Sequence, residues 1–328
     1  MSTPGDGLVY GVFGREIEEI LREHGYRSSP RVNSKLRGWR YRDRPVKPKV
    51  LGTRLPVSSI ASEYCPTSRD LYLRRVMGVE APPGPPLIRG VLYHSTLEAV
   101  VTYAKNLIYQ GLGPNFELAY KLPARAPAAV EHLLEREKDL IRRAGLERRD
   151  LEELRGNMLK LWRFEAGRIV GAVAGELSRS FRVGEDSLVA HAIPLTVEHR
   201  VDGGRLGLSS YLSIDAFQTT RPMILELKSG RERESHRLTL AGYALAFESA
   251  HKRPVNFGML AYIRFSTDRP IPWVIRRVYP IDERLRRRFL EVRDRKLELV
   301  HDQRDPGLPK QCPRGCAFFS TCRRESRP

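Results

Sequence analysis

The sequence predicts an α/β fold in which a mixed β-sheet follows a largely helical region. Before residue 187, apolar side chains recur roughly every three or four positions, which is typical of helices that pack through one face. From Val189 onward the pattern changes to β-branched and alternating runs, which indicate strands. One helical segment interrupts these runs. The expected order is therefore strand, strand, strand, helix, strand, strand, in a mixed sheet.

The elements follow from these patterns in chain order. Apolar residues set among charges predict helices, and Pro and Gly clusters mark the turns between them. Helices are expected at 8–25, 58–77, 90–110, 128–144, 151–180, 235–249 and 282–301, with a proline-rich turn at 82–86. Strands are expected at 189–201, 206–215, 223–228, 255–265 and 272–279.

Changes in composition divide the chain into four parts. Residues 1–57 form an N-terminal helix and a basic arm, and residues 58–186 form a helical region that contains the first cysteine. Residues 187–301 hold the sheet, and residues 302–328 form a tail rich in cysteine. With 328 residues and 41% apolar content, the chain can fill a large core without staples.

The charge balance favours a polyanionic partner. The chain has 57 Lys and Arg against 39 Asp and Glu, a net charge of +18, and such a field attracts nucleic acid in a salt-dependent way. A surface adapted for solubility or for a hot habitat is the alternative. No apolar run is long enough for a membrane span and no signal-like stretch opens the chain, so a cytoplasmic protein without membrane contact is expected.

Four cysteines are placed as a metal site would require. Cys65 stands alone, whereas Cys312, Cys316 and Cys322 lie in the last 17 residues with the spacing C-x₃-C-x₅-C. Zinc and a [4Fe–4S] cluster both accept four thiolates, so the ligand count leaves both open. The irregular spacing, without C-x₂-C knuckles, favours iron and sulfur. Unrelated buried cysteines are the third interpretation.

Two carboxylates and a lysine occur within neighbouring strand-like runs. Glu226 and Lys228 are two positions apart and should share one face, while Leu227 turns to the other face. If the run ending at Asp215 pairs with 222–229 as a hairpin, the loop 218–221 brings both carboxylates to one end of the sheet. Hard oxygen ligands so placed suit Mg²⁺ or Mn²⁺.

Two further features have open interpretations. His94 lies early on an expected helix and could add a neutral imidazole ligand, although a lone histidine is more often a packed or surface residue. In 27–54, Trp39 and Tyr41 alternate with basic residues, which suits stacking on bases and neutralising phosphates. These basic residues are Lys35, Arg37, Arg40, Arg42 and Arg44. The equal alternative is a solvated connector.

The motifs Arg89-Gly90-x-x-x-His94, Asp215, Glu226-Leu227-Lys228 and Tyr243 occur together with the four cysteines. In this combination the chain resembles the RecB-like PD-(D/E)xK nucleases, and among them the CRISPR-associated exonucleases that carry an iron–sulfur cluster. The segments 64–72 and 236–247 make the archaeal type I-A branch the most similar. The likeness extends from about residue 60 to residue 323.

The resemblance implies a restriction-endonuclease-like core, a helical N-terminal and insert subdomain, and a C-terminal Fe–S region. It implies that one Mn²⁺ or Mg²⁺ is held by His94, Asp215, Glu226 and the backbone carbonyl of Leu227. It further implies catalytic roles for Lys228, which would position and help deprotonate the attacking water, and for Tyr243. A [4Fe–4S] cluster would be held by Cys65, Cys312, Cys316 and Cys322. Family members usually carry Gln four residues before the tyrosine, where this chain has Thr239.

The implied function is a metal-dependent exonuclease that processes single-stranded DNA ends for CRISPR spacer acquisition, beside the integrase. A non-catalytic DNA-binding or assembly subunit that retains the fold is the main alternative. The complete set of carboxylates, histidine and lysine argues against it, because a scaffold has no need for desolvated carboxylates beside a lysine. A zinc-stabilised RNA-binding protein is a third alternative, and the strand context of Ile214 and Leu225 argues against that one.

Overall fold

The computed structural model describes residues 19, 21–22, 30–111, 116–179, 183–313 and 316–324. Its centre is a five-stranded sheet whose strands lie side by side in chain order. The strands are β1 (Leu195–Val201), β2 (Leu212–Gln218), β3 (Met223–Lys228), β4 (Phe257–Arg264) and β5 (Trp273–Pro280). Neighbouring strands are antiparallel except β3 and β4, which run parallel because α10 (Ser235–His251) crosses between them. The expected mixed α/β fold and its strand order are confirmed.

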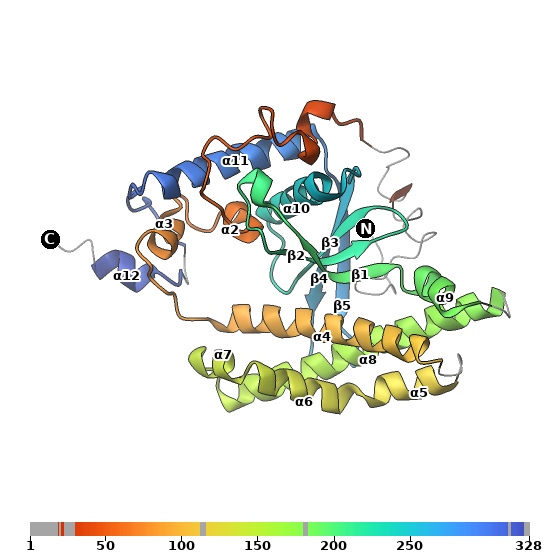
Figure 1. Ribbon diagram of the computed structural model, residues 1–328. Coiled ribbons are helices and arrows are strands. Elements are labelled where there is room, and N and C mark those ends of the chain that lie inside the picture. The colour runs from red at the N-terminus through yellow and green to blue at the C-terminus, as the bar shows by residue number, and fades with distance from the viewer. Residues whose placement is uncertain are drawn as a thin grey trace.

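Helices cover both faces of the sheet (Figure 1). On one face, α10 and α11 (Glu283–His301) pack over a core that includes Ile214, Ile224 and Leu260. On the other face, α4 (Pro85–Tyr109) and α8 (Arg148–Arg179) enclose a second core around Leu225 and Leu227. The other helices are α2 (Val57–Ala61), α3 (Arg69–Arg75), α5 (Phe116–Ala124), α6 (Ala126–Arg136), α7 (Lys138–Arg143), α9 (Glu185–Ala192) and α12 (Phe319–Arg324). Short 3₁₀ turns are η1 (Ser34–Leu36), η2 (Gly38–Arg40) and η3 (Gly204–Leu206).

Several expected boundaries are wrong for local reasons. The single helix expected at 58–77 is divided into α2 and α3, because the chain turns between them with Ser68 in a left-handed conformation at φ 61°. Cys65 therefore lies in a turn. Residues 189–192, expected to begin a strand, belong to α9, and β2 begins at Leu212 after η3 rather than at 206. The helix expected at 128–144 is divided into α6 and α7.

Two other helices depart from the expected pattern. The expected proline-rich turn at 82–86 overlaps the start of α4, whose first-turn prolines are tolerated there because no intrahelical N–H bond is needed. The helix α5 was not anticipated. The helix expected at 8–25 lies outside the described residues except for positions 19, 21 and 22, of which Leu21 is buried in the core under α4.

A buried ion cluster ties the N-terminal arm to the helical layer over the sheet. Glu248 of α10 is fully buried and accepts two hydrogen bonds of 2.9 Å from Arg286 of α11. It also accepts bonds from Arg37 at 2.7 Å and from the backbone N–H of Gly38 at 2.8 Å. Removing one member would leave an uncompensated charge in the core. Arg37, for which the sequence left nucleic-acid contact and a solvated connector equally open, is instead a buried structural residue.

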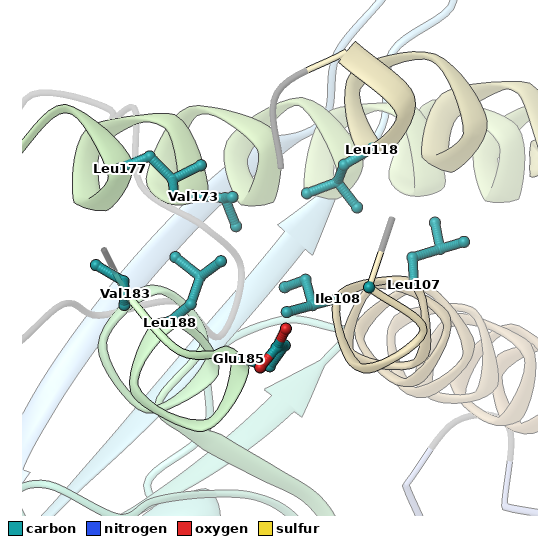
Figure 2. Close-up of a pocket in the computed structure, with 9 residues that line it drawn as sticks. Leu107, Ile108, Leu118, Val173, Leu177, Val183, Glu185 and Leu188 are labelled. Atoms are coloured by element: carbon teal, nitrogen blue, oxygen red, sulfur yellow. The ribbon is translucent and has the colours of Figure 1, made fainter. Parts of the chain in front are cut away.

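A small apolar pocket of about 90 Å³ lies among α4, α5, α8 and α9 (Figure 2). Its walls are aliphatic, with Glu185 as the one charged residue among those that line it. A void of this character is a gap in helix packing, and it offers no converging polar groups for a substrate. Among the helices of the described residues, none is long and apolar enough to cross a membrane.

Candidate active site

Asp215 lies at an irregular point of β2. Residues two apart on a regular strand share a face, yet Ile214 belongs to the core under α10 whereas Ala216 belongs to the core under α4. On β1 the matching irregularity falls at Glu198, a non-glycine residue with φ 46°. The side chains of both strands therefore change from one face of the sheet to the other at Glu198 and Asp215. Both carboxylates lie at this point of the β1–β2 hairpin.

Both oxygens of Asp215 have partners. Its Oδ2 accepts a hydrogen bond of 2.8 Å from the backbone N–H of Leu227 on β3. Its Oδ1 lies 3.2 Å from Nδ1 of His94, which α4 supplies. Asp215 thereby joins β2, β3 and α4, and it brings the expected histidine to the expected aspartate although they are far apart in sequence.

Glu226 and Lys228 lie together on the opposite face of β3 from Leu227, whose side chain is buried in the core under α4. Lys228 Nζ donates a hydrogen bond of 2.8 Å to Oε2 of Glu226. Glu226 is only 3% exposed, and its Oε1 has no hydrogen-bond partner within the described residues. A buried carboxylate oxygen without a partner is costly, and a bound cation or water is the usual explanation.

These side chains line an open cavity of about 360 Å³. The helix α10 contributes His236, Thr239 and Tyr243 to its wall, and residues within 58–64 contribute another part of the wall. Thr239 therefore lines the cavity, and it occupies the position where members of the family that this chain resembles usually have glutamine. The structure brings His94, Asp215, Glu226, Lys228 and Tyr243 to one cavity. Leu227 reaches the site through its backbone.

Burial and charge set the protonation of the cavity. Burial, reinforced by Asp215, raises the pKa of Glu226 to about 7, and Lys228 only partly offsets this rise. Burial would raise the pKa of Asp215, but His94, Lys228 and the Leu227 N–H together outweigh burial and lower it. The pKa of Lys228 is raised because Glu226 and Asp215 outweigh its desolvation. Asp215 therefore stays ionised, while Glu226 is partly protonated near neutral pH.

The donor set fits a divalent cation. His94, Glu198 and Asp215 each offer one ligand atom, and these atoms all lie within 4.8 Å of one another. The unpartnered Oε1 of Glu226 lines the same cavity. Carboxylate oxygens with one imidazole suit Mn²⁺ well and leave room for Mg²⁺. Sequence reasoning missed Glu198, because nothing in its alternating run signals the left-handed turn.

The C-terminal tail returns to Cys65. Arg69, just after this turn, binds both oxygens of Asp305 at 2.9–3.1 Å, and Thr67 donates a hydrogen bond of 2.9 Å to the carbonyl of Gly307. Cys322 and Cys316 pack with Leu73 of α3 in one small apolar cluster. Burial raises the pKa of both thiols, and neighbouring Cys65 raises them further. The first and the last cysteines are thus brought together across the chain.

The arm forms an open groove of about 540 Å³ on the surface. Tyr41 lies at its centre, with Lys252 at 4.7 Å and Arg205 at 4.9 Å from its ring. Arg40 and Arg42 line the groove and are exposed. Trp39 and Tyr41 are half-buried, so their rings both pack on the protein and face the groove. Of the five basic residues named from the sequence, Arg40 and Arg42 line this groove with Trp39 and Tyr41, whereas Lys35, Arg37 and Arg44 do not.

Comparison with known proteins identifies relatives along nearly the whole chain. The family model described as CRISPR-associated exonuclease Csa1 matches residues 12–325. A protein named CRISPR-associated exonuclease Csa1 from Saccharolobus solfataricus is 31% identical over 291 residues, 89% of this chain and 92% of that protein. A protein of the same name from Thermoproteus tenax is 30% identical over 310 residues, 94% of this chain and 98% of that protein. A solved structure titled "Crystal structure of SSO0001" covers 69% of this chain and 95% of its own at 15% identity, with a TM-score of 0.26, too low to inform the fold.

The fold and the cavity define a mixed α/β protein with a carboxylate, histidine and lysine centre at its sheet. Two relatives carry the same name, and the family model spans most of the chain. The chain belongs to the CRISPR-associated exonuclease Csa1 family. Its relatives come from archaea, in keeping with the resemblance to the type I-A branch.

The pKa of Glu226 predicts how stability depends on pH in chelator-treated protein. The folded-state pKa of about 7 exceeds the ordinary value of 4.5, so the contribution of Glu226 to stability is complete below pH 4.5 and is lost as pH rises through 7. Relative to Glu226→Gln, the wild type should lose on the order of 3 kcal/mol in unfolding free energy between pH 4.5 and 8. Denaturant titrations at several pH values measure the difference, and a constant difference would contradict it.

Proposed function

We propose that the chain is a metal-dependent exonuclease that hydrolyses single-stranded DNA from its ends during acquisition of CRISPR spacers, beside the integrase. The observation that carries this proposal is the convergence of His94, Asp215, Glu226 and Lys228 on one cavity, with a buried Glu226 oxygen left without a partner. Family membership supports the CRISPR-associated nuclease class. The net charge of +18 supports a polyanionic substrate.

In this proposal the core is of the PD-(D/E)xK type. His94, Asp215, Glu226 and the Leu227 carbonyl would hold one Mn²⁺ or Mg²⁺. When bound, the ion would lower the pKa of its water and neutralise charge on the scissile phosphate. Lys228, fixed by Glu226 at 2.8 Å, adds a positive charge beside the attacked phosphate and helps hold the water. Tyr243 and Thr239 line the part of the cavity wall that α10 forms, and they are placed to contact the substrate.

We further propose that the four cysteines hold a [4Fe–4S] cluster. The support for this assignment is the C-x₃-C-x₅-C spacing of the three late cysteines, which lacks the paired C-x₂-C knuckles of zinc ribbons. The tail that carries these cysteines returns to the turn at Cys65, which supports one site for all four thiolates.

Replacing either carboxylate should abolish cutting. End-labelled single-stranded DNA is incubated with Mn²⁺ and wild type, Asp215→Ala or Glu226→Ala. Each variant should lose more than about 100-fold in rate because it removes a direct metal ligand. Glu234→Ala is the matched control and should cut normally, since this exposed carboxylate pairs with Arg237 at 3.0 Å on the surface. If wild type binds DNA but cuts no substrate with any divalent metal, the non-catalytic assembly subunit becomes the better interpretation.

Anaerobically prepared protein should be brown and absorb broadly near about 400 nm through thiolate-to-iron charge transfer. Cys65→Ser and Cys322→Ser should each lose most of this absorbance together with bound iron, measured by metal analysis. Ser62→Ala, a change close to Cys65 that removes no thiol, is the control and should stay coloured. Colourless wild-type protein with stoichiometric zinc would refute the cluster.

The groove around Tyr41 should contribute to DNA affinity. Arg40→Ala with Arg42→Ala removes two exposed guanidinium groups, so affinity for single-stranded DNA should fall and its salt dependence should flatten by about 1.4 in log–log slope. Fluorescence anisotropy at several salt concentrations measures the slope. Arg148→Ala, which removes one exposed arginine paired with Glu152 on α8, is the control. An unchanged slope in the double variant would make the arm a connector.

A further inference from the structure

We infer that Glu198 of β1 is a direct ligand of the divalent cation, in addition to the residues that the family resemblance supplies. The inference deepens the proposed function and rests on it, because it assigns a further residue to the same metal centre. Sequence motifs do not mark this glutamate, and it comes from the adjoining strand rather than from the β2–β3 hairpin. Its assignment depends on position, backbone conformation and the charges around it.

Position is the first argument. A carboxylate oxygen of Glu198 lies within 4.8 Å of the ligand atoms of both His94 and Asp215. This is the one such group of three found among the described residues. Oxygen and nitrogen ligands bound at just over 2 Å to one ion lie about 3–4 Å apart, so small side-chain movements complete the set.

The backbone supplies the second argument. Glu198 adopts φ 46°, in the left-handed region that residues other than glycine rarely occupy within a strand. Ahead of it, Val197 packs toward the core under α4, and after it, His199 stacks on Phe217 of the opposite core. Strain of this kind costs on the order of 1–3 kcal/mol and persists where it serves a site. Here it turns the Glu198 side chain to the same place as Asp215.

One oxygen of Glu198 is fixed and the other is available. Its Oε2 accepts a hydrogen bond of 2.6 Å from Ser213 Oγ, a residue of the partner strand β2. No described residue bonds its Oε1. A carboxylate held through one oxygen by a neighbouring hydroxyl is the usual arrangement of a metal ligand with its supporting hydrogen bond.

The surrounding charge also favours a cation. Glu198 and Asp215 place two carboxylates beside His94, and Glu226 interacts with both Asp215 and His94. Among the described residues, Lys228 is the one Lys or Arg that forms an ion pair with any of these three carboxylates. The Oε1 atom of Glu226, a residue that is 3% exposed, has no hydrogen-bond partner among the described residues. A divalent cation would offset the repulsion among these carboxylates.

A metal titration of the full chain tests the inference without using activity. After chelator treatment, Mn²⁺ is added to wild type and variants, and free Mn²⁺ is followed by electron paramagnetic resonance. Glu198→Gln, which keeps the size of the side chain and removes its charge, should weaken Mn²⁺ binding at least about 10-fold. The matched control is Glu98→Gln on α4, because Glu98 is close enough to influence Glu198 but lies outside the group of ligand atoms. It should change affinity less than about 2-fold, as expected for a partly screened charge.

The outcomes separate this inference from the proposed function. If wild type binds Mn²⁺ and Asp215→Ala abolishes binding while Glu198→Gln leaves it unchanged, the metal centre stands and the role of Glu198 is refuted. Equal weakening by Glu198→Gln and Glu98→Gln would also refute it, because a general field effect would then suffice. Absence of Mn²⁺ binding by folded wild type would overturn both. Should Glu198→Gln unfold, Ser213→Ala keeps the carboxylate but releases it, and an unchanged Mn²⁺ affinity in that variant would refute the inference.

Discussion

The arrangement of the cavity depends on one buried carboxylate, that of Asp215. An ionised group so placed is stable only when its oxygens are paired, and each oxygen is assigned: one to the Leu227 N–H and the other to His94. Because these partners belong to β3 and α4, the carboxylate fixes the end of the β2–β3 ladder and the approach of α4 together. Glu226 is buried and lies close to this second negative charge, so its pKa rises, whereas His94, Lys228 and the Leu227 N–H lower the pKa of Asp215.

A second buried carboxylate, Glu248, has the corresponding role on the outer helical layer. It forms ion pairs with Arg286 and Arg37 and accepts hydrogen bonds from the backbone N–H groups of Gly38 and Val255. Close packing reinforces these bonds, since a Cβ at Gly38 would lie 1.9 Å from the carbonyl oxygen of Leu245. The arm is therefore fixed onto α10, the same helix whose other residues line the cavity. Its exposed groove and the cavity wall consequently share one rigid support.

The sequence predicted most of the fold because its signals are local. Alternation and helical spacing gave the five strands and α10, and the separation of Asp215 from Glu226 in a hairpin follows from strand pairing alone. The errors arose where tertiary context decides. The left-handed conformation of Ser68 divides one expected helix. The sequence around Arg37 is compatible with a nucleic-acid contact, but the structure pairs Arg37 with the buried Glu248. Glu198 was missed for the same reason, because its side chain is redirected by a backbone conformation that no residue type in the run announces.

The turn that contains Cys65 follows directly on residues that form part of the cavity wall. Residues 62–64 line the cavity and lead directly to Cys65, so any movement of that cysteine displaces the wall. Lys296 of α11 holds this segment by donating to the carbonyls of Ser59, Ile60 and Ser62 at the end of α2. After Cys65 in the sequence, Arg69 donates hydrogen bonds to both carboxylate oxygens of Asp305 in the tail. A group that joins Cys65 to the tail thiols would close a loop that spans 247 positions from Cys65 to Cys312, and loop entropy makes such long closures the most stabilising. The part of the cavity wall formed by residues within 58–64 is therefore held at both ends, by Lys296 on one side and by the cysteine turn on the other.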